Sequence, residues 1–212
     1  MALINSILGR IRGKIGDVVF QQNKGRQIAK LYQPNVANPR TGQQQANRSR
    51  FVTLMALGRT LMSVLRLGFK EYAGSVSWLN RFMSTNSSSG LLVYNGTTST
   101  WEPDYNNLVI AEGSLLQEDV TFVSLVGPVL TLEWSNTILG NQSLNDKLVV
   151  IAFCNSDTVT DIATVQRITG TIEITFTNTP SVGDIVSFAS YFVTEDARIV
   201  SNSYAHSFEV EA

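Results

Sequence analysis

The sequence predicts an α+β protein, in which a basic N-terminal arm with a β-hairpin and two helices precede an antiparallel, immunoglobulin-like β-sandwich. Apolar residues recur at helical spacings over residues 42–86, and from about residue 91 they alternate with polar residues. Gly, Asn, Asp and Pro turn signals punctuate that second part. Positive charge gathers in the first third of the chain. The predicted parts are 1–41, 42–90 and 91–212.

The N-terminal arm opens on a stretch that comes close to a phosphate-binding loop. Residues 8–17 read LGRIRGKIGD, but only three residues separate Gly9 from Gly13, where such a loop has four. Ile15 stands where a hydroxyl would hold Mg²⁺. We therefore expect no nucleotide site, and interpret the glycines as hinges in a flexible, positively charged arm.

A hairpin is predicted over residues 17–32. Val18–Phe20 begin one strand, Asn23-Lys24-Gly25 supplies the turn, and Gln27–Tyr32 forms the return strand. A two-stranded hairpin alone is marginal in water. We therefore expect it to pack on the rest of the protein or on a neighbour.

A long helix is predicted from about residue 42 to about 73, with Thr41 and Gln44 forming a capping box. Gly58 and Gly68 are the places where it could break. Its apolar positions are three or four residues apart: Phe51, Leu54, Leu57, Leu61, Leu65, Phe69 and Tyr72. A separate stripe of cations lies within roughly 40° on the helical wheel: Arg48, Arg59, Arg66 and Lys70. A shorter amphipathic helix is expected over Ser75–Asn86.

The strands of the sandwich are predicted from alternation and from turn signals. The candidates are Leu108–Ala111, Val120–Leu125, Val129–Trp134, Leu148–Phe153, Thr171–Phe176, Ile185–Val193 and Tyr204–Val210. The run LVVIAF within this set does not alternate, which favours a strand buried on both faces. About seven short strands at such spacing are typical of an immunoglobulin-size sandwich.

Charge divides the chain into unlike ends. Residues 1–70 hold twelve Lys or Arg and one acid, a net charge of +11, whereas residues 71–212 hold four basic and sixteen acidic residues, a net charge of −12. Such a split favours an anionic partner or self-association of unlike ends. The expected partner interface consists of Arg10, Arg12, Lys14, Lys24, Arg26, Arg48, Arg59, Arg66 and Lys70. Its target is either an acidic protein surface or DNA.

The chemistry-bearing residues do not assemble into a catalytic pattern. Cys154, the one cysteine, and His206, the one histidine, could formally form a dyad, but a cysteine ending a hydrophobic strand is more often structural. The acid pairs at 118–119 and 195–196 are typical of solvated turns. We expect no enzyme, no metal or other cofactor, and no small-molecule substrate. The sequence contains no apolar run of about 18 residues, so we expect no membrane-spanning helix.

Several stretches together resemble a family of proteins of about 200 residues and unassigned function from gut bacteria and their tailed, crAss-like phages. They are GKIGD (Gly13–Asp17), NPRTGQQQANRSRF (Asn38–Phe51), NNLVIAEGSL (Asn106–Leu115) and VSNSY (Val200–Tyr204). The chain departs from the family pattern at Gly42, where a proline is usual. The resemblance implies no catalytic residues.

By analogy with such phages, the resemblance implies a virion component made in the host cytoplasm. We expect a homo-oligomeric ring protein of the neck or tail barrel, in contact with neighbouring virion proteins. The alternatives are a capsid decoration protein, a carbohydrate- or cell-surface-binding module, and a nucleic-acid-binding protein that uses the basic third. Trp101 and Tyr105 are the best candidates for a sugar platform.

Overall fold

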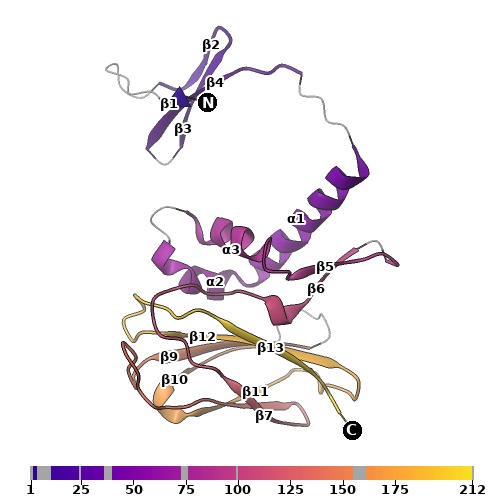
Figure 1. Cartoon of the computed structure of the whole chain (residues 1–212), viewed down its shortest axis with the longest axis vertical. Helices are drawn as coiled ribbons and strands as arrows, with labels where there is room; N and C mark the ends of the chain where they lie inside the picture. The colour runs from indigo at the N-terminus through magenta and orange to yellow at the C-terminus, as the bar shows by residue number, and fades with distance from the viewer. Residues whose placement is uncertain are drawn as a thin grey trace. The chain divides into compact units, whose positions relative to one another are not determined.

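A computed structural model of the chain describes residues 2–3, 11–23, 25–35, 40–72, 76–98, 100–154 and 161–211 (Figure 1). It is a mixed α+β protein whose sheets are antiparallel. The chain divides into two compact units, Met1–Gln44 and Gln45–Ala212.

The first unit is a four-stranded antiparallel sheet with the order β1-β4-β3-β2. Its strands are β1 (Ala2–Leu3), β2 (Gly13–Ile15), β3 (Val18–Asn23) and β4 (Arg26–Leu31). The predicted hairpin is present as β3 and β4. The expectation of a flexible arm is wrong for Gly13–Ile15, because this segment pairs with β3 as a third strand. Gly16, at φ 56°, makes the tight turn between them.

The long predicted helix is two helices, α1 (Gly42–Thr60) and α2 (Met62–Gly68), which meet at an angle of 87°. Of the predicted capping box, the hydrogen bond from Gln44 N to Thr41 Oγ1 is present, whereas Gln44 Oε1 has no hydrogen-bond partner among the described residues. The break lies at Leu61, and both Leu61 and Leu65 are fully buried beyond it. A straight helix would carry α2 away from the sheet that buries these side chains, so core packing overrides the continuous helical pattern.

Two shorter helical elements follow, the 3₁₀ turn η1 (Lys70–Tyr72) and α3 (Trp78–Asn86). The Ser77 side chain caps α3 by accepting a hydrogen bond from Asn80 N. Among the described residues, no single helix is long and apolar enough to cross a membrane, and the bent α1–α2 pair meets that test only by combined length and composition.

The remaining strands form two larger sheets and one hairpin. The three-stranded sheet has the order β11-β8-β7, from β7 (Thr121–Val126), β8 (Val129–Glu133) and β11 (Thr171–Thr175). The four-stranded sheet has the order β10-β9-β12-β13, from β9 (Lys147–Cys154), β10 (Asp161–Gln166), β12 (Ile185–Val193) and β13 (Tyr204–Glu209). The hairpin pairs β5 (Leu92–Asn95) with β6 (Thr100–Pro103). Strands β5, β6 and β10 were not predicted from the sequence.

Strand β9 lies in the middle of three layers (Figure 1). Its residues Leu148, Val150 and Ala152 join a hydrophobic cluster with the three-stranded sheet. Val149, Ile151 and Phe153 point to the opposite side, into a cluster with the helices. The prediction that LVVIAF is buried on both faces is confirmed. On that side, Tyr191 donates a hydrogen bond of 3.0 Å to Val64 O, and burial raises the pKa of its phenol.

Residues 108–111 were predicted as a strand, and this is wrong: the segment is not part of a sheet. Side chains replace the strand partner. Asn86 accepts from Val109 N at 2.9 Å and donates to Val109 O at 2.7 Å, and Ser203 Oγ accepts from Ile110 N at 3.1 Å. The hydrophobic pattern indicated burial correctly, but it could not indicate what satisfies the backbone.

Candidate functional site

The first unit presents a basic face that the strand register defines. Lys14, Val19 and Lys30 lie opposite one another on β2, β3 and β4, so their side chains share one face. Arg26 and Ile28 follow on the same face of β4, at alternate positions before Lys30. We call the set Lys14, Val19, Arg26, Ile28 and Lys30 the basic face.

Local contacts orient the cations around this face. Lys14 Nζ lies 3.6 Å from the ring centroid of Tyr32, a cation–π contact. Arg12, just before β2, donates from Nη2 at 2.9 Å to Oε1 of Gln22, whose position on β3 faces the other side of the sheet. The whole unit holds seven basic residues and one acid, Asp17, a net charge of +6. Lys and Arg side chains on one face of a sheet favour an anionic surface.

The predicted interface residues fall on separate elements. Lys14 and Arg26 lie in strands of the sheet and Arg12 directly precedes β2, whereas Arg10 and Lys24 lie outside the described residues. Lys30 also belongs to the basic face, although it was not among the predicted interface residues. Its alignment with Lys14 follows only from the strand register, which the sequence alone does not give.

The basic stripe predicted for a single helix is divided by the 87° bend. Arg48 and Arg59 lie on α1, Arg66 on α2 and Lys70 in η1. Lys70 Nζ donates to Ala197 O at 2.5 Å, and the Arg66 guanidinium lies 5.7 Å from the Trp78 ring centroid. The helical-wheel alignment holds only along a straight helix, so these four cations do not form one continuous stripe.

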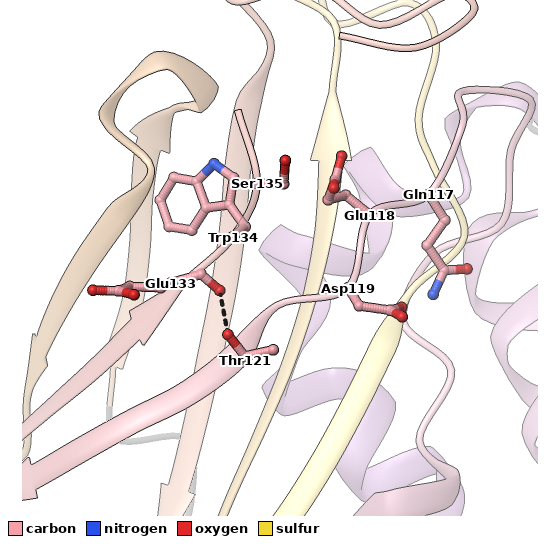
Figure 2. Close-up of a pocket in the computed structure, with 7 residues that line it drawn as sticks. All are labelled: Gln117, Glu118, Asp119, Thr121, Glu133, Trp134 and Ser135. Atoms are coloured by element: carbon pink, nitrogen blue, oxygen red, sulfur yellow. Dashed lines mark hydrogen bonds between the residues drawn. The ribbon is translucent and has the colours of Figure 1, made fainter. Parts of the chain in front are cut away.

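A second feature is an acidic hollow of about 660 Å³ at the end of the three-stranded sheet (Figure 2). It is lined by Gln117, Glu118, Asp119, Thr121, Glu133, Trp134 and Ser135. Figure 2 shows Thr121 beside Glu133, where Thr121 Oγ1 donates to Glu133 O at 3.1 Å. Trp134 is only 6% exposed, so its ring is not a stacking platform for a ligand.

One acid of this hollow, Glu118, pairs with a buried arginine. The Arg167 side chain is fully buried, with Nη1 at 3.1 Å from Glu118 Oε2 and Nε at 3.7 Å from Asp146 Oδ2. Its guanidinium lies 3.8 Å from the Phe192 ring centroid. Burial lowers the pKa of Arg167, while the charges of Asp146 and Glu118 oppose that shift. This arrangement is a structural ion-pair network that joins loops to both sheets.

The other residues weighed for chemistry are not brought together. Cys154 and His206 lie on opposite sides of β12, opposite Val186 and Phe188 respectively, so a strand separates them. Tyr105 stacks on Phe153 with ring centroids 4.3 Å apart, and Trp101 donates to Ala46 O at 3.1 Å. Among the described residues, no group of three or more His, Cys, Asp or Glu is placed to hold a metal ion.

The fold and the basic face define an α+β protein with a small basic sheet ahead of a larger, helix-covered β unit. The chain belongs to a family of unknown function, DUF6266, which matches residues 10–206. A search of curated proteins found no match.

Proposed function

We propose that strands β7 to β13 form an immunoglobulin-like β-sandwich. The support is a set of seven antiparallel strands divided into sheets of three and four that share one hydrophobic cluster. Strand β10 pairs with β9, whereas in antibody constant domains the fourth strand belongs to the other sheet. Such sandwiches serve as scaffolds for many unrelated activities, so this topology alone specifies no function.

We propose further that the protein is a non-enzymatic structural protein that assembles with copies of itself. The observation that carries this proposal is the charge asymmetry between the basic sheet, at +6, and residues 71–212, at −12. The basic face of one copy would bind the acidic surface of the next, a heterologous contact that can close into a ring. The resemblance to proteins of tailed phages suggests a ring in the neck or tail barrel of a virion as the assembly.

The acceptor surface suggested by the structure is the outer face of the three-stranded sheet. Glu133 on β8 and Glu173 on β11 are exposed there, and they flank Thr131. Their alternation with the buried Leu130, Leu132 and Ile172 places them on the solvent side of the sheet. Carboxylates at this spacing complement a row of lysines on the basic face.

Light scattering on the full chain across ionic strengths tests the assembly. We expect the wild-type chain to form oligomers that dissociate as the salt concentration rises. The double variant Lys14→Glu with Lys30→Glu should fail to form these oligomers even at low salt. The matched control is Lys147→Glu with Arg198→Glu, which makes the same change in net charge at exposed cations of the second unit. The control should assemble normally. A wild-type chain that stays monomeric, and is absent from virions imaged by cryo-electron microscopy, would contradict the proposal.

DNA is the second candidate partner, favoured by the same basic face. Phosphate contacts require only clustered cations, and Tyr32 is a nearby aromatic ring. In a gel-retardation assay, binding through this face should weaken steeply with salt and be lost in the Lys14→Glu, Lys30→Glu variant. Binding that is absent, or that does not depend on salt, rejects this candidate.

A further inference from the structure

The opposite face of the N-terminal sheet is apolar. Ile15, Val18 and Leu31 lie opposite one another on β2, β3 and β4, and Phe20 lies opposite Ala29 one step along. We call Ile15, Val18, Phe20, Ala29 and Leu31 the apolar face. Ile15 and Leu31 are 63% and 73% exposed. The remaining side chains of β3 and β4 on this face, Gln22 and Gln27, are uncharged.

The described residues of this sheet form no core of their own. Within the first unit, none of the described side chains is buried. A small antiparallel sheet becomes stable only when its hydrophobic face packs against another layer. A unit of about 40 residues without disulfides or metal usually obtains that layer by association. The apolar face is therefore one half of an interface.

We propose that the apolar face packs against the same face of a second copy of this chain. The inference rests on the proposed self-assembly, but it concerns a different surface from the basic face. Charge favours this occupant: the strand residues of the apolar face are uncharged, and Arg12, which reaches Gln22, lies at the edge of the sheet, so two copies meet there with less repulsion than two basic faces. The outer face of the three-stranded sheet is a poorer cover, because it carries Glu133, Glu173 and several threonines.

The size of the face sets the strength of the contact. Strands β3 and β4 have six residues each, β2 has three and β1 has two, so at about 3.3 Å per residue and about 4.8 Å between strands the sheet presents roughly 270 Å² per copy. A pair would bury roughly 540 Å², below the roughly 1,200 Å² of a stable interface. The pairing therefore adds to other contacts and depends on protein concentration. Because it is a two-fold contact, any closed assembly that uses it contains an even number of copies.

Cysteine cross-linking of the full chain tests the pairing, in a Cys154→Ser background. Ala29→Cys places a thiol near the middle of the apolar face, and Lys30→Cys places one on the basic face at the next position of the same strand. With a short bis-maleimide reagent, we expect Ala29→Cys to yield a covalent dimer and Lys30→Cys to remain mostly uncoupled. Leu31→Asp, at a residue that is 73% exposed, should reduce the Ala29→Cys dimer at least tenfold.

The outcomes separate this inference from the proposed function. If the chain assembles by light scattering but Ala29→Cys does not cross-link, or Leu31→Asp has no effect, the pairing of apolar faces is wrong and self-assembly stands. Protection of the face by the same chain would also leave Ala29→Cys monomeric, and so overturns the pairing. If the chain is monomeric at every concentration and does not cross-link, both proposals fail. Hydrogen exchange across β3 and β4 confirms that each variant retains its sheet.

Discussion

Asn86 joins the helices to the segment that leads into the sandwich. Its amide is fully buried and makes both a donor and an acceptor hydrogen bond with the backbone of Val109, as well as a bond to Phe82 O. No other common side chain of this size offers a donor and an acceptor in that geometry. In a sequence, a polar residue at the end of an amphipathic helix predicts solvent exposure, which is why this contact was not anticipated.

Asn86→Ala should therefore lower the free energy of unfolding by about 2–4 kcal/mol, because it leaves buried backbone groups of Val109 unpaired. Urea unfolding monitored by circular dichroism measures the change. Asn80→Ala, at an exposed position of the same helix, is the control and should change stability by less than about 0.5 kcal/mol. An equal effect at both positions would contradict a special role for the Asn86 amide.

Arg167 illustrates the difference between buried and exposed ion pairs. Arg167→Ala should cost about 3–5 kcal/mol, since it leaves the carboxylates of Glu118 and Asp146 without their buried counter-charge. The pair of Arg198 and Asp196 is the comparison, with side chains 81% and 54% exposed. Arg198→Ala should cost less than about 1 kcal/mol. Thermal unfolding of the two variants side by side tests the contrast.

At the scale of elements, strands in which apolar and polar residues alternate strictly could be predicted from the sequence, and strands without that alternation could not. In β8 and β11, Leu130, Leu132, Ile172 and Ile174 alternate with polar residues, and the predicted spans agree with the observed ones within a residue or two. Strands β5 and β6 have four residues each, too few for a period to emerge, and in β10 the adjacent Ile162 and Ala163 interrupt the alternation. The bend at Leu61 was not predictable, since it depends on a sheet made of residues far away in the sequence.

The sequence predicts several of the basic residues of the candidate site, but not how they are arranged on the sheet. Arg12, Lys14 and Arg26 were identified from charge alone. The division of the sheet into a basic and an apolar face requires the pairing of Gly13–Ile15 with β3, and three residues are too few for a period to emerge from sequence. The glycines near this strand were interpreted as hinges, whereas Gly16 supplies a tight turn.

Gly68 marks the closest approach between a helix and the rest of the second unit. A Cβ at this position would overlap Ile110 O and lie 2.9 Å from the Ala111 Cβ. Gly68→Ala should thus destabilise the protein by more than about 2 kcal/mol, despite the helix propensity of alanine. Gly42→Ala is the control: it meets no atom within 4 Å and should be neutral or stabilising by up to about 1 kcal/mol. Denaturant midpoints compare the two, and an unaffected Gly68→Ala variant would show that the segment at 110–111 can move aside.

At the scale of the whole molecule, the protein consists of one unit with a large core and one without. The hydrophobic clusters that contain β9 and β12 lie in Gln45–Ala212, whereas the described side chains of the first unit are all at least partly exposed. The two units should therefore differ in whether they fold alone.

A fragment of residues 40–212, which retains the Thr41 cap of α1, should unfold cooperatively with a midpoint within a few degrees of the full chain. It should also be monomeric at concentrations where the full chain assembles. Calorimetry and light scattering measure both properties. An insoluble or unfolded fragment would show that the N-terminal sheet contributes to the core, and an assembled fragment would place the self-association elsewhere.

The hydrogen bonds of the helical layer reach almost to the end of the chain. Val64 O receives the Tyr191 hydroxyl, Glu71 accepts from Val200 N at 2.8 Å, and Ile110 N donates to Ser203 Oγ. During synthesis the helices leave the ribosome long before these partners exist, and contacts of such long sequence separation form slowly. The nascent helices must wait, with Leu61, Leu65 and Phe69 uncovered, until residues 191–203 have been translated. The larger unit is therefore expected to need protection by chaperones while it is being made, even though it is the stable part of the finished protein.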